Sequence, residues 1–342
     1  MKIAVLGYGY WGPNAVRSLC QLVGAGGVVV CDPRPEALAR AAAEHPGVAL
    51  CDDRARLLCE PSISAFYLCT PAATHFQLAG EALDAGKHVL VEKPFATSGE
   101  EAESLFRRAR RAGLVLMAGH LYLHAPAVRA LKDVIESGEL GELRYVYSQR
   151  TSLGPRARED VSVVWDYFAH DAYLIPYLVG SAPESVTACG GSYLRPGIAD
   201  VVFAGMRFPG SLIASCHAGW YDPLKVRRLC VVGSRKMALY DDCSPDSPLV
   251  VYDRGYASFD GVDVFGNRGL ERYDRGAEAV PVAGEPPLLA QCRAFLEAAE
   301  AGFAIEEHAA SVLATTALLE ATELSLKDGG RCTTLQQPAQ SR

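Results

Sequence analysis

The stretch IAVLGYGYWGP, residues 3–13, decides the fold expected for the N-terminal part of this chain. Its apolar start is typical of a short buried strand, and Gly7, Gly9 and Gly12 follow in the spacing Gly-x-Gly-x-x-Gly. Pro13 suits the first turn of a helix. A strand, a glycine-rich turn and a helix in this order predict the first βαβ unit of a dinucleotide-binding domain.

The glycine turn is expected to bind a pyrophosphate. Without side chains at three positions, the backbone can turn tightly and approach the phosphates, whose charge would lie at the N-terminus of the following helix. Tyr10 and Trp11 complete the turn and are counted among the candidate cofactor contacts. Taken alone, the glycines would also be compatible with a turn that binds no ligand.

Asp32 follows the second predicted strand, residues 28–31, and makes the ligand more specific. Its carboxylate can accept hydrogen bonds from both ribose hydroxyls of NAD, whereas the 2′-phosphate of NADP would meet a like charge. Asp32 lies somewhat further from the glycine turn than the usual spacing of about 20 residues, and Arg34 offers an alternative contact for a 2′-phosphate. The prediction is NAD, with NADP as the alternative.

The remaining residues up to about 120 alternate short β-rich runs with helical stretches. Further strands are predicted at 65–69, 88–91 and 115–118, while Thr74 and Ser98 are predicted to cap helices. Right-handed crossovers would stack these strands into one parallel sheet. The expected N-terminal domain is therefore a doubly wound α/β Rossmann domain over residues 1–121.

Beyond residue 125 the pattern changes, and 342 residues allow about two domains. Residues 122–342 are expected to form a C-terminal α+β domain with a large, mostly antiparallel, open-faced sheet, which binds substrate and forms oligomers. The predicted elements are a helix at 126–136, a strand at 143–150, a loop at 153–160, a helix at 164–178, strands within 185–252, an extended loop at 253–284, helices at 287–301 and 309–327, and a frayed tail at 336–342.

Composition excludes several classes of protein. The 49% hydrophobic and 21% charged residues are ordinary for a soluble globular protein. A net charge of −7 without a basic cluster argues against nucleic acid as a partner. There is no apolar run of about 18 to 20 residues and no signal-peptide pattern, so we expect no membrane association and a cytoplasmic location.

The eleven cysteines are expected to be buried thiols, because the count is odd and most lie in apolar segments. The chain has no Cys-x-x-Cys motif. Neither Cys216 with His217 nor His120 with His124 is accompanied by further zinc ligands. No metal is therefore expected.

Glu92 and Lys93 follow the predicted strand at 88–91 and would lie at the carboxyl edge of the sheet, where open α/β sheets bind ligands. Lys93 would reach the nicotinamide. A partly desolvated lysine can have its pKa lowered towards neutrality, which suits proton exchange with a hydroxyl. Spacing alone gives equal weight to an ordinary surface lysine.

Asp166 and His170 are four residues apart in a predicted helix, so both side chains would lie on one face. Such a pair suits acid–base chemistry. Considered without other motifs, an ion pair on the helix surface or a capped core histidine is the more common explanation.

Several motifs together resemble the glucose-fructose oxidoreductase, inositol dehydrogenase and rhizopine catabolism (Gfo/Idh/MocA) family over nearly the whole chain, and in particular its nucleotide-sugar 3-dehydrogenases and sugar 3-ketoreductases. Besides the glycine turn, the matching segments are Thr70-Pro71 with His75, Glu92-Lys93-Pro94, Gly119-His120, Trp165-Asp166 with His170-Asp171, Lys225-Val226-Arg227-Arg228, and Gly233-Ser234-Arg235-Lys236-Met237-Ala238.

The resemblance implies roles for these residues. Lys93 would be the catalytic lysine, and Asp166 and His170 would contact the reacting hydroxyl. It also implies that substrate lies between the nicotinamide and the second sheet, and that the chain forms homodimers or homotetramers through that sheet. The cofactor contacts would be Gly7, Gly9, Tyr10, Trp11, Gly12, Asp32, Thr70, Pro71, His75, Glu92 and Lys93, and the substrate contacts Lys93, Tyr122, Gln149, Trp165, Asp166 and His170.

One departure from the family concerns the aromatic pair Tyr167 and Phe168, where small or aliphatic residues are usual after Trp-Asp. Tyr173 and Tyr177 lie further along the same predicted helix. We expect these side chains to pack in the core, with a reshaped sugar pocket as the alternative.

The resulting hypothesis is an NAD-dependent dehydrogenase that oxidises a secondary ring hydroxyl, at C3 of a sugar or amino sugar or the equivalent carbon of a cyclitol, or reduces the ketone. The Ala-, Arg- and Gly-rich composition adds aminoglycoside or other specialised sugar biosynthesis as a context. Two alternatives remain: a non-catalytic sugar and NAD sensor of the same fold, and an NAD-dependent glycosidase that oxidises its substrate transiently.

Overall fold

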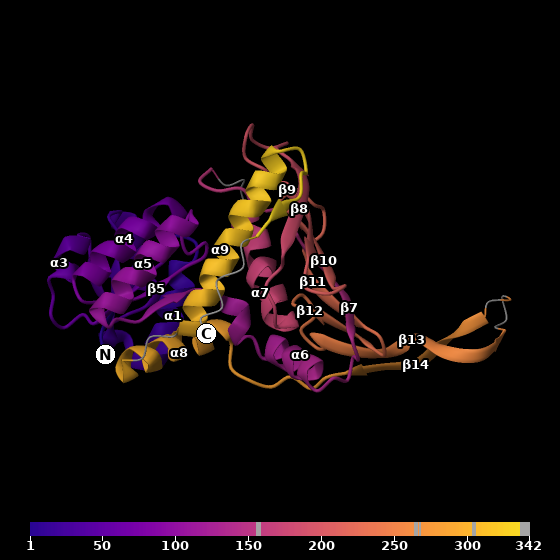
Figure 1. The fold of residues 1–342 in the computed structure, drawn as a ribbon. Helices are drawn as coiled ribbons and strands as arrows, with labels where there is room; N and C mark the ends of the chain where they lie inside the picture. The colour runs from indigo at the N-terminus through magenta and orange to yellow at the C-terminus, as the bar shows by residue number, and fades with distance from the viewer. Residues whose placement is uncertain (155–158, 263–265, 267, 303–305, 336–342) are drawn as a thin grey trace. The chain divides into compact units, whose positions relative to one another are not determined.

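The computed structural model describes residues 1–154, 159–262, 266, 268–302 and 306–335. Contacts divide the chain into two compact units (Figure 1). The first consists of Met1–His124 and Glu285–Glu320, and the second of Ala125–Gly284 and Ala321–Arg342.

The first unit contains a six-stranded sheet in which every strand pair is parallel, in the order β3-β2-β1-β4-β5-β6. This order confirms the predicted Rossmann sheet. The strands are β1 (Ile3–Leu6), β2 (Val28–Cys31), β3 (Ala49–Cys51), β4 (Ala65–Leu68), β5 (His88–Val91) and β6 (Leu116–Ala118). The edge strand β3 was not predicted, because it is short and largely exposed and so lacks an apolar run.

Helices cover both faces of this sheet. On one face the core includes α1 (Gly12–Val23), α2 (Pro35–Glu44) and α8 (Pro287–Ala301), and on the other α4 (His75–Asp84) and α5 (Gly99–Ala112). Alternate residues of each strand pack in the cores on the two faces of the sheet. The short helix α3 (Arg54–Leu58) lies between β3 and β4.

The two predicted helix caps differ. Ser98 caps α5 as expected, since its side chain accepts a hydrogen bond from the Glu101 N–H at 3.2 Å. Thr74 does not cap α4, because its backbone is already helical and its hydroxyl donates to the carbonyl oxygen of Pro71 at 2.7 Å.

Helix α8 belongs to the first unit, although all residues after 121 were predicted to form the second domain. The apolar side chains of Cys292, Phe295 and Leu296 pack in the same core as Leu19 of α1 and Tyr67 of β4. Residues 285–320 therefore complete the Rossmann domain, because α8 supplies the apolar surface that covers part of one sheet face. The following helix, α9 (Glu306–Lys327), begins in the first unit and ends in the second.

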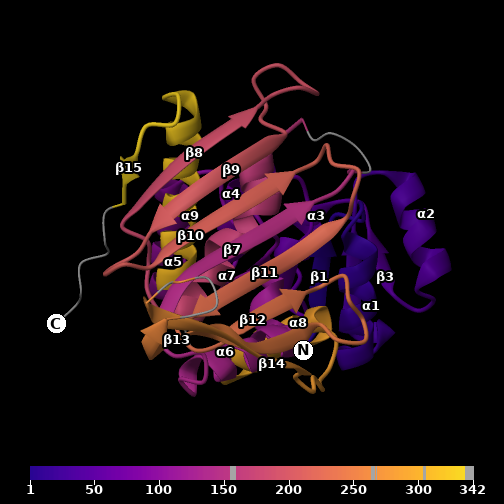
Figure 2. The same ribbon diagram turned by 90° about the vertical axis from the view of Figure 1, so that its right-hand side faces the viewer.

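The second unit contains a nine-stranded sheet in the order β14-β13-β12-β11-β7-β10-β9-β8-β15, which Figure 2 shows nearly face-on. Among the strands that the structure describes here, only β7 and β10 pair in parallel, so the sheet is mostly antiparallel, as predicted. The strands are β7 (Leu143–Thr151), β8 (Ser185–Gly191), β9 (Val201–Arg207), β10 (Ile213–Gly219), β11 (Val226–Gly233), β12 (Met237–Asp241), β13 (Leu249–Val262), β14 (Arg268–Ala279) and β15 (Thr333–Thr334).

The prediction of an extended loop at 253–284 was wrong for most of that range. Strands β13 and β14 form a long hairpin, and only Leu249–Tyr252 of it pairs with β12. The distal part extends beyond the neighbouring strands (Figure 1). Many of its side chains are exposed, so the apolar alternation that normally indicates a strand is absent from this sequence.

Two helical elements of the second unit match predictions: α6 (Pro126–Glu136), and the segment formed by a π-helical turn at Val164–Phe168 and α7 (Ala169–Val179). Phe168 and Tyr173 are buried, in agreement with core packing, whereas the Tyr167 hydroxyl lies 2.8 Å from the Ser152 hydroxyl. Helix α7 lies behind the sheet in Figure 2. Part of the loop predicted at 153–160 and the tail at 336–342 lie outside the described residues.

All eleven cysteines lie in the described ranges and are free thiols. The expectation of burial was too broad, because Cys59, Cys189, Cys243 and Cys332 are exposed. No group of three or more His, Cys, Asp or Glu side chains among the described residues is placed to hold a metal ion. None of the helices described is both long and apolar enough to cross a membrane.

Candidate active site

The three glycines of the first turn are needed for different structural reasons. Gly7 has φ of +92°, and a Cβ there would lie 2.8 Å from the carbonyl oxygen of Cys69. A Cβ on Gly12 would overlap the carbonyl oxygen of Gly7. At Gly9 a Cβ would meet nothing within 4 Å. Gly7 and Gly12 are thus required by packing, whereas Gly9 faces the open space that a ligand needs for close approach.

The N-terminus of α1 fits an anionic group. Its N-cap residue, Trp11, provides no side-chain cap, and the first turn contains no acidic residue. The first backbone N–H groups are therefore available to phosphate oxygens. Tyr10 is 82% exposed beside this turn, while the Trp11 indole N–H donates to the Tyr67 hydroxyl at 3.4 Å.

The glycine turn is held by residues that were not predicted from the sequence. The buried Tyr8 donates its hydroxyl proton to Glu44 at 2.7 Å, and Arg40 donates to the carbonyl oxygens of Tyr8 and Gly9. The Arg40 guanidinium also lies over the Tyr8 ring. These contacts from α2 fix the turn, and no local motif indicates them.

Asp32 is at the carboxyl end of β2 and is 2% exposed. It accepts hydrogen bonds from the Tyr8 N–H at 2.8 Å, from the Arg34 N–H at 3.0 Å and from the Arg34 guanidinium at 2.9 and 2.8 Å. Burial acts to raise the pKa of Asp32, but these hydrogen bonds outweigh it and hold the pKa below its usual value. The carboxylate is therefore ionised at neutral pH.

The Thr70-Pro71 loop is joined to the Lys93-Pro94 loop by His75. The buried His75 ring has Nδ1 2.8 Å from the carbonyl oxygen of Pro94 and Nε2 3.0 Å from that of Thr70. The position of His75 thus indicates that it holds two loops at the carboxyl edge of the sheet together.

Glu92 lies in a buried polar network behind Lys93. The Glu92 carboxylate accepts hydrogen bonds from the Tyr67 hydroxyl at 2.5 Å and from the Lys93 N–H at 3.2 Å. Gln291 of α8 donates to the Tyr67 hydroxyl at 3.2 Å. Burial raises the pKa of Glu92, while these donors and the Lys93 charge oppose the shift.

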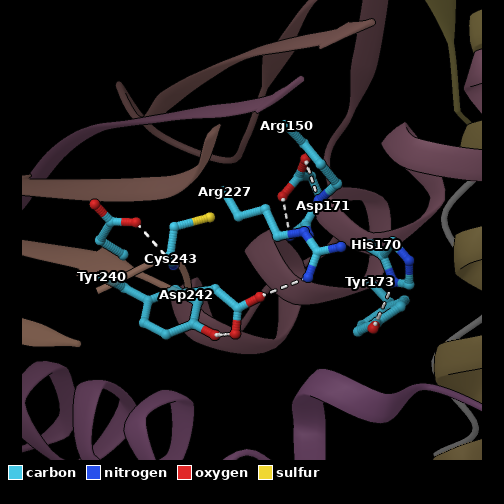
Figure 3. Close-up of polar contacts among 9 residues, drawn as sticks. Arg150, His170, Asp171, Tyr173, Arg227, Tyr240, Asp242 and Cys243 are labelled. Carbon is cyan, nitrogen blue, oxygen red and sulfur yellow. Dashed lines mark hydrogen bonds and ion pairs between the residues drawn. The ribbon is translucent and has the colours of Figure 1, made fainter. Parts of the chain in front are cut away.

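In the second unit, aromatic residues hold the predicted acid–base pair. Asp166 lies in the π-helical turn and accepts a hydrogen bond from the Trp220 indole N–H at 2.9 Å. His170 Nδ1 is 3.1 Å from the Tyr173 hydroxyl, as Figure 3 shows. Trp220 follows β10, and sequence spacing gave no indication of its contact with Asp166.

A buried ion pair lies next to His170. Arg150 of β7 contacts Asp171 of α7 at 3.3 Å, and both side chains are almost fully buried (Figure 3). Burial raises the pKa of Asp171, and the Arg150 charge opposes that rise. The pair fixes α7 to the sheet and with it the neighbouring His170.

Gln149 is not brought to Asp166 and His170. Successive residues of a strand point to opposite faces, and Arg150 points to the α7 face. Gln149 instead lines a shallow depression on the other face, together with Tyr147, Phe203 and His217. No local signal in the sequence indicates which residues of β7 point towards α7.

The other candidates divide between the two units. The first contains the glycine turn, Asp32, the Thr70 loop, Lys93 and the buried Tyr122, and the second contains Trp165, Asp166 and His170. Trp165 is buried in the same π-helical turn as Asp166. Each unit thus supplies part of the predicted catalytic set.

Comparisons with known proteins agree with this geometry. Residues 1–120 match the model of an oxidoreductase family with an NAD-binding Rossmann fold, and residues 128–239 match a GFO/IDH/MocA C-terminal domain. The glycine turn and the fold define an NAD-binding oxidoreductase.

Individual relatives extend the match. UDP-N-acetylglucosamine 3-dehydrogenase of Acidithiobacillus ferrooxidans is 30% identical over 87% of this chain and 88% of its own length. Its solved structure covers 96% of this chain and 98% of that one with a TM-score of 0.79. The chain belongs to the Gfo/Idh/MocA family.

Two further matches carry different names. A 4-carboxy-2-hydroxymuconate-6-semialdehyde dehydrogenase of a Sphingobium species is 28% identical over 84% of this chain and 92% of its own length. GenD2 from gentamicin A biosynthesis, solved with NAD, has the same fold with a TM-score of 0.80 and 22% identity, covering 98% of this chain and 97% of that one. Family membership alone therefore leaves the substrate open.

Proposed function

We propose that this protein oxidises a secondary ring hydroxyl of a sugar, amino sugar or cyclitol to a ketone, or runs the reverse reaction, with NAD preferred over NADP. The observation that carries the proposal is Lys93, which follows β5 next to the buried Glu92 and Tyr67 network, in a domain whose glycine turn fits a dinucleotide. The similarity to UDP-N-acetylglucosamine 3-dehydrogenase supports a sugar and position C3.

The mechanism requires two transfers. Bound NAD supplies the acceptor for the hydride that leaves the ring carbon. The hydroxyl proton must leave at the same time, and Lys93 is the proposed acceptor. Glu92 accepts a hydrogen bond from the Lys93 N–H and so orients the backbone that bears the lysine. Asp166 polarises the imidazole of His170 while the Trp220 N–H holds the carboxylate in place.

The wider assignments also remain proposals. The unit formed by Met1–His124 and Glu285–Glu320 would bind the cofactor, in place of the predicted range 1–121, and the other unit would bind substrate, with Tyr122 and Trp165 as further substrate contacts. The face of the nine-stranded sheet that carries the exposed Tyr145, Tyr147 and Phe203 would form a homodimer or homotetramer interface. A cytoplasmic location and a role in aminoglycoside or other specialised sugar biosynthesis complete the proposal.

A substrate screen tests the activity. The purified protein is incubated with NAD and a panel of free sugars, cyclitols, nucleotide sugars and aminoglycosides, and NADH formation is measured. A substrate turned over at C3 is the expected result. Turnover confined to aldehydes would contradict a ring-hydroxyl dehydrogenase. Tightly retained cofactor without net NADH release would favour the glycosidase, and binding of sugar without turnover would favour the sensor.

Lys93→Met tests the assigned proton acceptor. Turnover should fall by about a thousandfold, because proton transfer by a positioned side chain contributes about 10² to 10⁴ in rate. The NADH dissociation constant should stay within about threefold of its original value, since the glycine turn is untouched. Lost NADH binding with normal turnover per bound cofactor would remove Lys93 from this role.

A further inference from the structure

The Asp32 carboxylate, which the NAD assignment requires for the adenosine ribose, is already fully occupied. One oxygen accepts from the N–H and the Nε of Arg34, at 3.0 and 2.9 Å. The other accepts from the Tyr8 N–H and a terminal nitrogen of Arg34, both at 2.8 Å. An ionised carboxylate has about four acceptor positions, so no further donor can be added without displacing one of these four.

Two of the four donors are fixed and two are displaceable. The Tyr8 N–H belongs to the glycine turn, and the Arg34 N–H belongs to the residue that precedes α2. The guanidinium donors come from a side chain that is 55% exposed. Asp32 itself is buried, but the released guanidinium can be solvated at the surface and the ribose hydroxyls replace its two hydrogen bonds to the carboxylate, so the exchange can occur when the cofactor binds.

We propose that Arg34 determines cofactor specificity by competing with the ribose for Asp32. In the free protein its guanidinium holds the two acceptor positions that the ribose hydroxyls of NAD need, and it swings away when the cofactor binds. Once released, it lies beside the ribose as a counter-charge for a 2′-phosphate. Arg34 therefore weakens NAD binding, and it allows NADP to bind despite the carboxylate.

Cofactor titrations with Arg34→Met test both effects. NADH and NADPH dissociation constants are measured by calorimetry for the native protein, for Arg34→Met and for Arg17→Met. Arg17 is the matched control, because it is an exposed arginine of α1 whose guanidinium contacts Asn14. In Arg34→Met, NADH should bind about two- to fivefold more tightly and NADPH at least about tenfold more weakly. Arg17→Met should change neither constant by more than about twofold.

A second set of variants separates the two residues. Asp32→Asn should improve NADPH binding by about tenfold or more, because the like charge is removed while Arg34 stays. Adding Arg34→Met to that variant should abolish the gain. Weaker NADH binding in Arg34→Met, or NADPH binding equal to that of Arg17→Met, would overturn the proposal.

The same titrations distinguish failure of this proposal from failure of the NAD assignment. If the native protein bound neither cofactor, the NAD site itself would be wrong, and the role of Arg34 with it. Unfolding midpoints measured for every variant show whether a change in affinity reflects a change in folding, and a gain in NADH affinity cannot arise from a loss of folded protein.

Discussion

The two units place their candidate residues in different ways. In the first, Asp32 and Lys93 follow directly on parallel strands, so the backbone alone brings them to one edge of the sheet. In the second, Asp166 depends on Trp220 and Asp171 depends on Arg150, partners on other strands or loops. Sites built at strand ends can therefore be found from local sequence, whereas sites built on side-chain pairs need the tertiary structure.

Arg150→Met is expected to have the largest effect among the variants that test this difference between the units. The free energy of unfolding should fall by about 3 to 5 kcal/mol, because Asp171 would stay buried without its partner. Urea denaturation measures this change. NADH binding below the unfolding transition should persist, since the glycine turn and Asp32 belong to the other unit.

Arg228→Met is the matched control in the same sheet. Arg228 pairs with Asp241 at 2.6 Å but is 56% exposed, so its loss should cost no more than about 1 kcal/mol. If Arg150→Met and Arg228→Met lowered the free energy of unfolding equally, burial of the Arg150–Asp171 pair would be unimportant. The second unit would then not depend on buried side-chain pairs in the way described above. Replacing Arg150 and Asp171 together by Met and Leu should recover much of the stability.

His308 is an exception within the first unit, because here a side chain holds the end of a strand. The Ala118 N–H donates to His308 Nε2 at 2.8 Å, and burial lowers the pKa of His308 to about 4. The unfolded pKa is about 6.5, so the unfolded chain binds more protons between these values. The stability contributed by neutral His308 is complete above about pH 6.5 and is lost as pH falls towards 4, by up to about 1.4 kcal/mol per unit.

His308→Gln should remove this dependence while its carboxamide oxygen still accepts from Ala118. The free energy of unfolding, measured at pH 7, 6 and 5, should then decrease less steeply with falling pH in the variant than in the native protein. At pH 7 the two proteins should differ in this free energy by about 1 kcal/mol or less. An unchanged slope would show that the neighbouring His120 and His124 dominate the acid response instead.

A smaller effect is expected from Trp220→Phe. Phenylalanine keeps an aromatic ring at this buried position, although a smaller one, and Asp166 loses the indole N–H. With the substrate identified, kcat/KM should fall about tenfold, in line with the loss of one hydrogen bond to a charged group, while NADH affinity is unchanged. If kcat fell by the same factor at every pH, so that the shape of its pH profile was unchanged, Trp220 would act only on the folding of the pocket.

Much of the first unit could be predicted because parallel strands buried on both faces are continuous apolar runs. The exceptions follow from the same physics. Ala49–Cys51 is exposed and has no such run. Helix α8 has an apolar stripe, but nothing in its sequence states that this stripe covers a sheet whose strands all lie before residue 119.

The site shows the same limit. Gly7, Asp32 and Lys93 could be proposed from the sequence because chemistry and position coincide at strand ends. Tyr67 is an apolar-looking strand residue, and only the fold places its hydroxyl against Glu92. In β7 the sequence does not indicate which face is buried, so the contact between Arg150 and Asp171 could not be predicted.

The route of the chain between the units limits how this protein can be recombined with its relatives. A contiguous N-terminal piece ending near residue 121 lacks α8, and would leave the apolar side chains of Leu19 and Tyr67 without Phe295 and Leu296. Exchange of cofactor preference by transplanting a whole domain therefore has to carry two separate segments of the gene, 1–124 and 285–320. Single-residue changes around Asp32 offer evolution and engineering a shorter route to the same end.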